Sequence, residues 1–94
     1  MAELETIILD GAWMLTRRAA HDYLAERLGL PAYYGRNLDA LYDLLTERAG
    51  PTRLVLRHRE ALLCWLGGYG EALCRTLEDA GRANPGLEVR FSDE

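Results

Sequence analysis

The chain has 94 residues, a formal net charge of −4 and two cysteines. This length allows one domain with a modest core, and no apolar run approaches the roughly 20 residues that cross a bilayer. Affinity for a phosphate backbone comes mainly from cations, so the acidic balance argues against nucleic-acid binding and favours a basic protein partner. We therefore expect a single domain over residues 1–94, with neither a nucleic-acid nor a membrane partner.

The beginning of the sequence and its cysteines indicate the compartment. Residues 1–5 carry acidic side chains where a secretory signal needs a basic segment followed by an apolar one, which predicts a cytoplasmic location. Cys64 and Cys74 lie in apolar, helix-like stretches and form neither a CxxC pair nor a Cys/His ligand spacing. Two cysteines are too few for a disulfide framework, so we interpret both as reduced thiols in the core.

Three short segments predict β-strands. They are bounded by turn residues and are rich in β-branched or alternating apolar side chains, which favour an extended, half-buried backbone. These segments are residues 4–9, 53–57 and 87–91. The stretches between them are long enough to hold helices, and connections of that length let successive strands run parallel.

Four helices are predicted between these strands. Apolar side chains recur at helical spacing over four segments, residues 18–28, 37–47, 60–66 and 69–83. Thr16 is a candidate cap for the first helix and Gly29 lies just past its end, while Gly67-Gly68 separates the last two. This order predicts an α/β fold in which a small three-stranded parallel sheet is packed by about four helices.

The second predicted helix has one apolar and one acidic face. At about 100° per residue the leucines at positions 38, 41, 44 and 45 fall within one arc, which predicts the core face. Asp39, Asp43 and Glu47 lie on the other side, flanked by Tyr42 and Thr46. Each pair of acidic residues four positions apart repels by about 0.2 to 0.5 kcal/mol. Such a stripe is either an ordinary solvated face or a surface whose repulsion a cationic partner removes.

The loop and the beginning of this helix carry a specific motif. Residues 33–43 contain Tyr-Tyr-Gly-x-Asn-Leu-Asp-Ala-Leu-x-Asp without a gap. This segment closely resembles the signature of the barstar family, the intracellular inhibitors of the ribonuclease barnase, and the resemblance extends from about residue 7 to residue 91. The order of strands and helices predicted above agrees with a barstar-like fold.

The resemblance implies a function. The chain is expected to be a cytoplasmic inhibitor of a secreted, guanyl-preferring microbial ribonuclease, with no enzymatic activity, monomeric when free and bound to its partner one to one. An immunity protein for a larger antibacterial toxin with a different ribonuclease domain is the alternative. Asp43 is expected to enter the enzyme's phosphate-binding site, where its carboxylate takes the place of the RNA phosphate. From the resemblance and the acidic stripe together, the candidate partner-binding residues are Tyr33, Gly35, Asn37, Leu38, Asp39, Tyr42, Asp43, Thr46, Glu47 and Asp79.

Four positions depart from the family pattern. Tyr42 and Arg48 stand where barstar has tryptophans, and Arg36 and Ala83 stand where it has acidic residues. These departures lie at the rim of the implied surface. The inhibitory activity is therefore better supported than the identity of the target.

The motif residues also have local structural interpretations. Tyr33 is predicted to point outward as a contact and Tyr34 inward as part of the core. Gly35 is expected to need a positive φ or to allow the close approach of another backbone. Asn37 is predicted to cap the helix that follows it.

No catalytic, metal or cofactor site is expected. Asp39 and Asp43 form an exposed pair on one helix, which offers no pocket for acid–base catalysis and too few oxygens for a calcium site. His21 and His58 have no catalytic neighbours at a recognisable spacing and are interpreted as surface or hydrogen-bonded histidines. Trp13 and Trp65 are interpreted as residues of the core or its edge.

Overall fold

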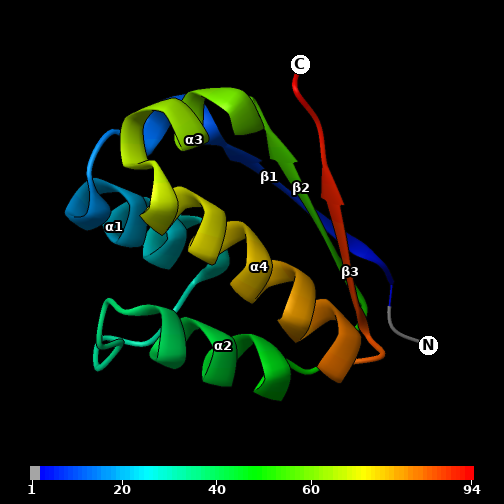
Figure 1. The fold of residues 1–94 in the computed structure, drawn as a ribbon. Helices are drawn as coiled ribbons and strands as arrows, with labels where there is room; N and C mark the ends of the chain where they lie inside the picture. Colours follow the sequence, from blue (N-terminus) through cyan, green and yellow to red (C-terminus); the bar gives the residue numbers. More distant parts are fainter. Residues whose placement is uncertain (1–2) are drawn as a thin grey trace.

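A computed structural model, which describes residues 3–94, shows a two-layer α/β fold (Figure 1). Its three strands form one parallel sheet in the order β1-β2-β3. The register places Ile7 opposite Leu54, and Leu54 opposite Val89. The predicted three-stranded parallel sheet is confirmed. The strands are β1 (Glu5–Asp10), β2 (Thr52–Arg57) and β3 (Leu87–Phe91).

Four α-helices connect the strands and cover one face of the sheet (Figure 1). The first two join β1 to β2, and the last two join β2 to β3. Right-handed crossovers that proceed in one direction across a sheet place their helices on the same side, which agrees with this arrangement. A short 3₁₀ helix that the sequence did not predict, η1 (Gly11–Trp13), follows β1. The α-helices are α1 (Arg17–Leu28), α2 (Leu38–Glu47), α3 (Arg59–Leu66) and α4 (Gly68–Ala83).

Local capping explains where α1 and α2 begin. The Thr16 side chain accepts a hydrogen bond from the Ala19 amide at 3.0 Å, and α1 ends at Gly29 in the left-handed conformation. The Asn37 side chain accepts a hydrogen bond from the Ala40 amide at 2.7 Å. Both predicted caps are confirmed, because each supplies an acceptor to an amide that has no partner within its helix.

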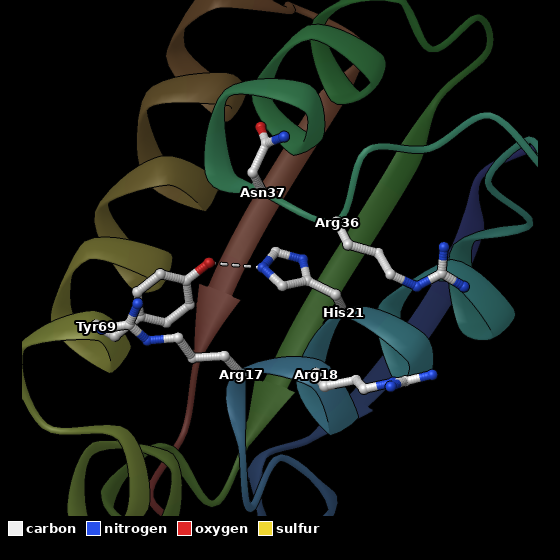
Figure 2. A pocket seen from close by; sticks show the side chains of 6 residues that line it. All are labelled: Arg17, Arg18, His21, Arg36, Asn37 and Tyr69. Carbon is white, nitrogen blue, oxygen red and sulfur yellow. Dashed lines mark hydrogen bonds between the residues drawn. The ribbon is translucent and has the colours of Figure 1, made fainter.

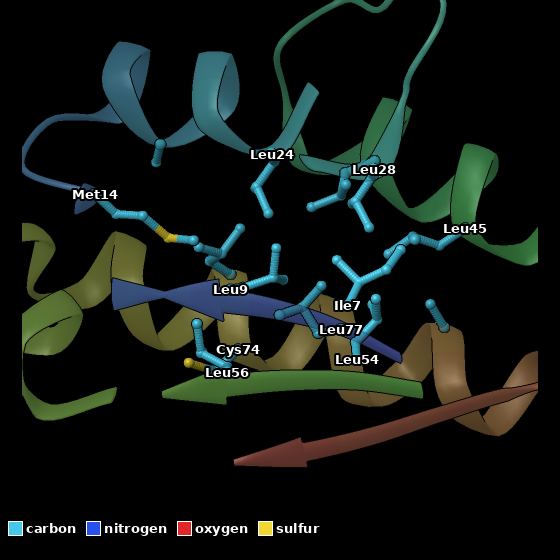
Figure 3. Packing of buried hydrophobic residues seen from close by; sticks show 14 of the residues in the cluster. Ile7, Leu9, Met14, Leu24, Leu28, Leu45, Leu54, Leu56, Cys74 and Leu77 are labelled. Carbon is cyan, nitrogen blue, oxygen red and sulfur yellow. The ribbon is translucent and has the colours of Figure 1, made fainter. Parts of the chain in front are cut away.

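The core lies between the inner face of the sheet and the helices (Figure 3). On α2, Leu41 and Leu45 are completely buried, whereas Leu38 and Leu44 are half-buried and pack against the edge of the same cluster. The predicted core face of α2 is therefore confirmed. Cys74 also belongs to this cluster, as predicted. The sheet contributes Ile7, Leu9, Leu54, Leu56 and Leu87.

Three residues that were expected in the core or at its edge lie at the surface. Trp13 is 67% exposed, Trp65 is 59% exposed, and Cys64 is also exposed. Their neighbours Met14 and Leu62 are completely buried and occupy the core positions of these segments instead. Apolar character predicts that a side chain gains from burial, but only the tertiary arrangement decides which of several adjacent apolar side chains is covered.

Within residues 3–94, no helix combines the length and the apolar character needed to cross a membrane. The same part of the chain contains no group of three His, Cys, Asp or Glu side chains that could hold a metal ion.

Candidate functional site

The acidic face of α2, formed by Asp39, Asp43 and Glu47, is exposed to solvent. None of these three carboxylates forms an ion pair with any residue from 3 to 94. Several other surface carboxylates do. The carboxylates of Asp22, Glu5 and Glu88 pair with arginines at 2.7, 3.0 and 2.7 Å. The acidic face therefore carries negative charge that no neighbouring side chain compensates.

The rest of α2 holds this face in a fixed orientation. Leu41 and Leu45 on the opposite side are completely buried, so the helix cannot rotate about its axis without losing core contacts. Asn37 fixes the first turn as the N-cap. At the other end, the Asn84 amide donates hydrogen bonds to the carbonyls of Leu45 (2.9 Å) and Arg48 (3.1 Å). The carboxylates thus project from a rigid element.

A hollow of about 350 Å³ lies between α2 and the loop that precedes it. We call it the acidic hollow. Tyr33, Tyr34 and Gly35 line it from the loop, and Asp43 and Glu47 line it from the helix. The structure therefore brings four of the predicted partner-binding residues, Tyr33 among them, to one concave place. An aromatic ring beside two carboxylates can bind a cationic side chain, through a cation–π contact and charge-assisted hydrogen bonds.

Tyr33 and Tyr34 point in opposite directions, as the sequence predicted. The Tyr33 side chain is 80% exposed, whereas Tyr34 is only 4% exposed. The buried ring anchors the loop, and the exposed ring is left free beside the acidic hollow. This arrangement offers a large aromatic contact to a partner at little cost in conformational entropy.

The anchor of Tyr34 is a hydrogen-bonded cluster with His21 and Tyr69. His21 Nδ1 lies 2.5 Å from the Tyr34 hydroxyl, and His21 Nε2 lies 2.6 Å from the Tyr69 hydroxyl. Burial lowers the pKa of His21 from 6.5, with the nearby Arg36 guanidinium as a second cause, and it raises the pKa of Tyr34 to about 12. Burial thus favours the neutral forms of His21 and Tyr34, and His21 is the hydrogen-bonded histidine that was expected (Figure 2).

The structure corrects the interpretation of Gly35. Gly35 does not have a positive φ; the left-handed residue of this loop is Arg36, with φ of 53°. A Cβ atom on Gly35 would lie 2.9 Å from Asn37 Nδ2. The same Nδ2 atom donates a hydrogen bond to the Gly35 carbonyl at 3.2 Å. Glycine suits this position because the side chain of the helix cap folds back over it.

Leu38, Tyr42 and Thr46 flank the acidic face and do not project from it. Leu38 and Tyr42 are half-buried and pack against the core. The half-buried Thr46 uses its hydroxyl to donate a hydrogen bond to the Asp43 carbonyl at 2.9 Å. These side chains form a partly apolar border beside the carboxylates.

Asp79 differs from the acidic residues of α2. It lies on α4, and its carboxylate pairs with Arg82 Nη2 at 2.7 Å. The two residues are three positions apart on one helix, a spacing that places side chains side by side, so the sequence held a signal for this pair. Asp79 does not line the acidic hollow. Its carboxylate therefore has an ionic partner within residues 3–94, unlike the three carboxylates of the acidic face.

Arg48 is a structural residue. Its guanidinium donates hydrogen bonds to Thr52 Oγ1 at 3.2 Å, to the Leu28 carbonyl at 3.0 Å and to the Glu5 carboxylate at 3.0 Å. The side chain is 22% exposed. It joins the end of α1 to the beginnings of β1 and β2. The departure from the family pattern at this position therefore changes internal packing and not the rim of the acidic face.

Comparison with known proteins identifies the family of this chain. Residues 4–92 match the protein family described as "Barstar (barnase inhibitor)". Over 78 residues, the chain is 38% identical to a Bacillus subtilis (strain 168) protein named "Putative ribonuclease inhibitor YrdF". The alignment covers 82% of this chain and 86% of that relative. The chain therefore belongs to the barstar family.

Proposed function

We propose that this protein inhibits a microbial ribonuclease by covering its active site with the acidic face of α2. The observation that carries this proposal is a row of exposed carboxylates, unpaired within residues 3–94, on a helix whose opposite face is buried. A ribonuclease must hold cationic groups to bind the phosphates of RNA. A rigid row of carboxylates is complementary to such a site in charge. Membership of the barstar family and the name of the Bacillus relative support the same role.

Asp43 is the residue we assign to the enzyme's phosphate-binding site. It is exposed in the middle of the acidic face and also lines the acidic hollow beside Tyr33. Its carboxylate would accept charge-assisted hydrogen bonds from the arginine, lysine or histidine side chains that otherwise bind the scissile phosphate. Burying this charge is favourable only when such partners replace its water. Inhibition then follows from occupancy of the active site, without any bond being made or broken.

The finer features of the proposal concern the target and the complex. We propose a guanyl-preferring secreted enzyme as target, a complex of one inhibitor with one enzyme, and a free inhibitor that is monomeric and held in the cytoplasm. The alternative role is immunity to a larger toxin, and its support is the set of positions that depart from the barstar pattern. Arg48 points into the protein and Arg36 pairs with Asp22, so two of these departures do not alter the acidic face itself.

The proposal is tested by titrating the purified protein against a panel of ribonucleases. The panel should hold secreted guanyl-preferring enzymes, ribonuclease domains of antibacterial toxins, and a pancreatic-type ribonuclease. We expect complete inhibition of at least one microbial enzyme at one equivalent, measured as RNA cleavage, with a matching one-to-one complex in size-exclusion chromatography with light scattering. A chelator should leave inhibition unchanged.

A matched pair of variants links inhibition to the acidic face. Asp39→Asn, Asp43→Asn and Glu47→Gln in one chain should abolish inhibition without unfolding the protein. Glu71→Gln, on the exposed surface of α4, should inhibit like the unmodified protein. Lack of inhibition across the whole panel, or full inhibition by the triple variant, would contradict the proposal.

A further inference from the structure

The two edges of the sheet differ in how their backbone groups are satisfied. The strand order leaves β1 at one edge and β3 at the other (Figure 1). Along β1, the Asp10 amide donates a hydrogen bond to the Tyr23 hydroxyl at 2.8 Å. The Ile8 carbonyl accepts one from Arg27 Nε at 3.2 Å. Side chains of α1 thus occupy backbone groups that a further strand would need, which partly closes this edge.

The orientation of the backbone groups of β3 follows from its register with β2. The Thr52 amide donates a hydrogen bond to the Gly86 carbonyl at 2.8 Å. The Ser92 amide donates one to the Leu56 carbonyl, also at 2.8 Å. In a parallel pair, the groups that face the neighbouring strand belong to every second residue. The backbone groups of residues 86, 88, 90 and 92 therefore face β2, whereas those of residues 87, 89 and 91 face away from it.

The β3 edge lacks the side-chain partners that the β1 edge has. Among residues 3–94, no side chain or loop forms a hydrogen bond with the amide or carbonyl of Val89 or Phe91. At the beginning of the strand, the Leu87 amide donates a hydrogen bond to the Asn84 carbonyl at 2.9 Å. An uncovered edge of this kind is a template for pairing with another strand.

The sequence of β3 is complementary to itself in the antiparallel direction. It is Leu-Glu-Val-Arg-Phe, in which apolar and charged residues alternate about the central Val89. In an antiparallel pair centred on Val89, Glu88 of each copy lies opposite Arg90 of the other. Leu87 lies opposite Phe91 in the same pair. Opposite charges in facing positions of two strands stabilise the pair, and apolar residues in facing positions pack together.

The charged residues of β3 are available for such a contact. Leu87, Val89 and Phe91 face the core, so Glu88 and Arg90 project from the other face of the sheet, which the helices leave uncovered (Figure 1). Their side chains are 44% and 58% exposed. Arg90 contacts Glu88 of its own chain through Nε at 2.8 Å, so its terminal nitrogens keep donors for a second carboxylate.

The core side of the β3 edge has room for the side chains of a neighbouring strand. A hollow of about 370 Å³ lies there, between α4 and β3. On α4, Gly81 leaves the space above the strand open, since a Cβ atom at this position would lie 3.2 Å from Val89 Cγ2. Val89 and Phe91 are consequently only half-buried. The residues that line the hollow are Glu78, Gly81, Arg82, Leu87, Val89 and Phe91.

We propose that β3 pairs with β3 of a second copy of this chain, antiparallel and centred on Val89. In this register the two Val89 residues exchange their N–H···O=C hydrogen bonds. The Phe91 amide of each copy donates to the Leu87 carbonyl of the other, and the Leu87 amide keeps its own partner, Asn84. The sheets of the two copies then form one continuous sheet.

The dimer should be weak and should form in concentrated solution. A contact between two strands of 5 residues belongs to the small interfaces, below about 1,200 Å², that are typical of transient association. The monomeric inhibitor proposed above is then the form in dilute solution. None of the residues of β3 lines the acidic hollow, so pairing through β3 does not occupy that site.

The test is sedimentation of the purified protein over a wide range of concentrations at low salt. We expect a reversible equilibrium between monomer and dimer. Arg90→Glu and Glu88→Arg should each weaken the dimer at least about tenfold, because like charges then face each other at both positions. Mixing the two variants should restore association, since every glutamate of one chain then faces an arginine of the other.

Two further variants sharpen this test. Glu71→Arg reverses an exposed charge on α4, away from β3, and should associate like the unmodified protein. Val89→Pro removes the central N–H, which faces away from β2, and should abolish the dimer without loss of a bond within the sheet. Urea unfolding of each variant shows that it is folded.

Three results would overturn the proposal. The first is a monomer at every concentration, and the second is a failure of the mixed variants to associate. The third is a dimer that Arg90→Glu and Val89→Pro leave intact, which would assign association to another surface, such as the exposed Trp13 and Trp65. No ribonuclease is present in this experiment, so its outcome is independent of the inhibitor proposal.

Discussion

The acidic face of α2 and the buried cluster of His21, Tyr34 and Tyr69 differ in whether their polar groups have partners within the protein. In the cluster, each ring nitrogen of His21 has a hydroxyl partner within 2.6 Å. On the acidic face, the carboxylates of Asp39, Asp43 and Glu47 have no ionic partner among residues 3–94. Internal pairing stabilises the fold, whereas exposed charge on a rigid helix is available to another molecule. Substitutions in the two regions should therefore separate folding from binding.

The largest expected effect is the loss of binding in Asp43→Ala. Removing this carboxylate would leave the enzyme's cationic phosphate site buried without a counter-charge. We expect a loss of more than about 2 kcal/mol of binding free energy, the usual threshold for a dominant interface residue in protein complexes at large, barnase with barstar among them. The affinity for the inhibited ribonuclease should be measured by calorimetry or by inhibition at equilibrium.

The control for Asp43→Ala is Glu26→Ala, which removes an exposed carboxylate from α1. Both variants should unfold in urea much like the unmodified protein, because neither carboxylate has a partner within residues 3–94. Equal affinities for Asp43→Ala and Glu26→Ala would show that Asp43 does not lie at the centre of the interface.

The reverse separation is expected for Tyr34→Phe. This change removes the hydroxyl partner of His21 Nδ1 and leaves a buried polar atom without a hydrogen bond, at a cost of about 1 to 3 kcal/mol in the free energy of unfolding. The matched variant Tyr33→Phe alters a side chain that is 80% exposed and should leave stability unchanged. Urea unfolding of the two variants gives the comparison. If both variants were equally stable, the cluster would not anchor the loop.

The same cluster predicts how stability depends on pH. The pKa of His21 is lower in the folded protein than its ordinary value of 6.5, so the unfolded chain takes up a proton first as the pH falls. The free energy of unfolding should therefore decrease from about pH 6.5 downward, until the pH passes the folded-state pKa of His21. Arginine partners lower the pKa values of Asp22 and Glu88 from 3.8 and 4.5, so their contributions are lost only in more acidic solution.

Urea unfolding at about pH 7.5 and about pH 5.5 measures this loss. His21→Gln should make the stability of the protein less dependent on pH across this window. His58→Gln is the matched control, because His58 lies outside the cluster, and it should keep the full dependence. Identical pH profiles for the two variants would show that His21 does not control the acid sensitivity.

The fold could be predicted from sequence because its signals are local. The spacing of the leucines on α2, the caps Thr16 and Asn37, and the alternating apolar residues of β3 each act within a few residues of chain. The acidic face was predictable for the same reason, since its three carboxylates lie on one helix. Local periodicity therefore identified both the core and the charged surface of this segment.

Features that depend on distant residues could not be predicted in this way. Arg48 binds the Leu28 carbonyl and the Glu5 carboxylate, which are 20 and 43 positions away. A hollow of about 860 Å³ that is lined by Arg17, Arg36 and Tyr69 (Figure 2) likewise combines residues from α1, the loop before α2 and the beginning of α4. Trp13 and Trp65 are exposed because no other element within residues 3–94 packs over them, and composition does not indicate how elements pack.

The smallest expected effects compare the two ends of the acidic face. Asp39 lies in the first turn of α2, where the helix dipole favours a negative charge by about 0.3 to 1 kcal/mol, whereas Glu47 is the last residue of the helix, where the dipole opposes it.

Asp39 and Glu47 each lie four positions from Asp43 and repel it by about 0.2 to 0.5 kcal/mol. Glu47→Gln should thus raise the free energy of unfolding by a few tenths of a kcal/mol, since both terms act in the same direction. In Asp39→Asn the two terms oppose each other, so stability should stay the same or fall slightly. Thermal unfolding at low salt resolves the difference.

The two variants should also differ in binding kinetics, because Glu47 lies at the end of the acidic face and a peripheral charge mainly steers association. Glu47→Gln should slow association and reduce its salt dependence with little change in dissociation. Asp39→Asn, beside the beginning of the helix and the Tyr33 loop, should speed dissociation as well. If Glu47→Gln destabilised the free protein, the Glu47 carboxylate would have a structural partner. Only Asp39 and Asp43 would then remain as the unpaired carboxylates on which the inhibitor proposal depends.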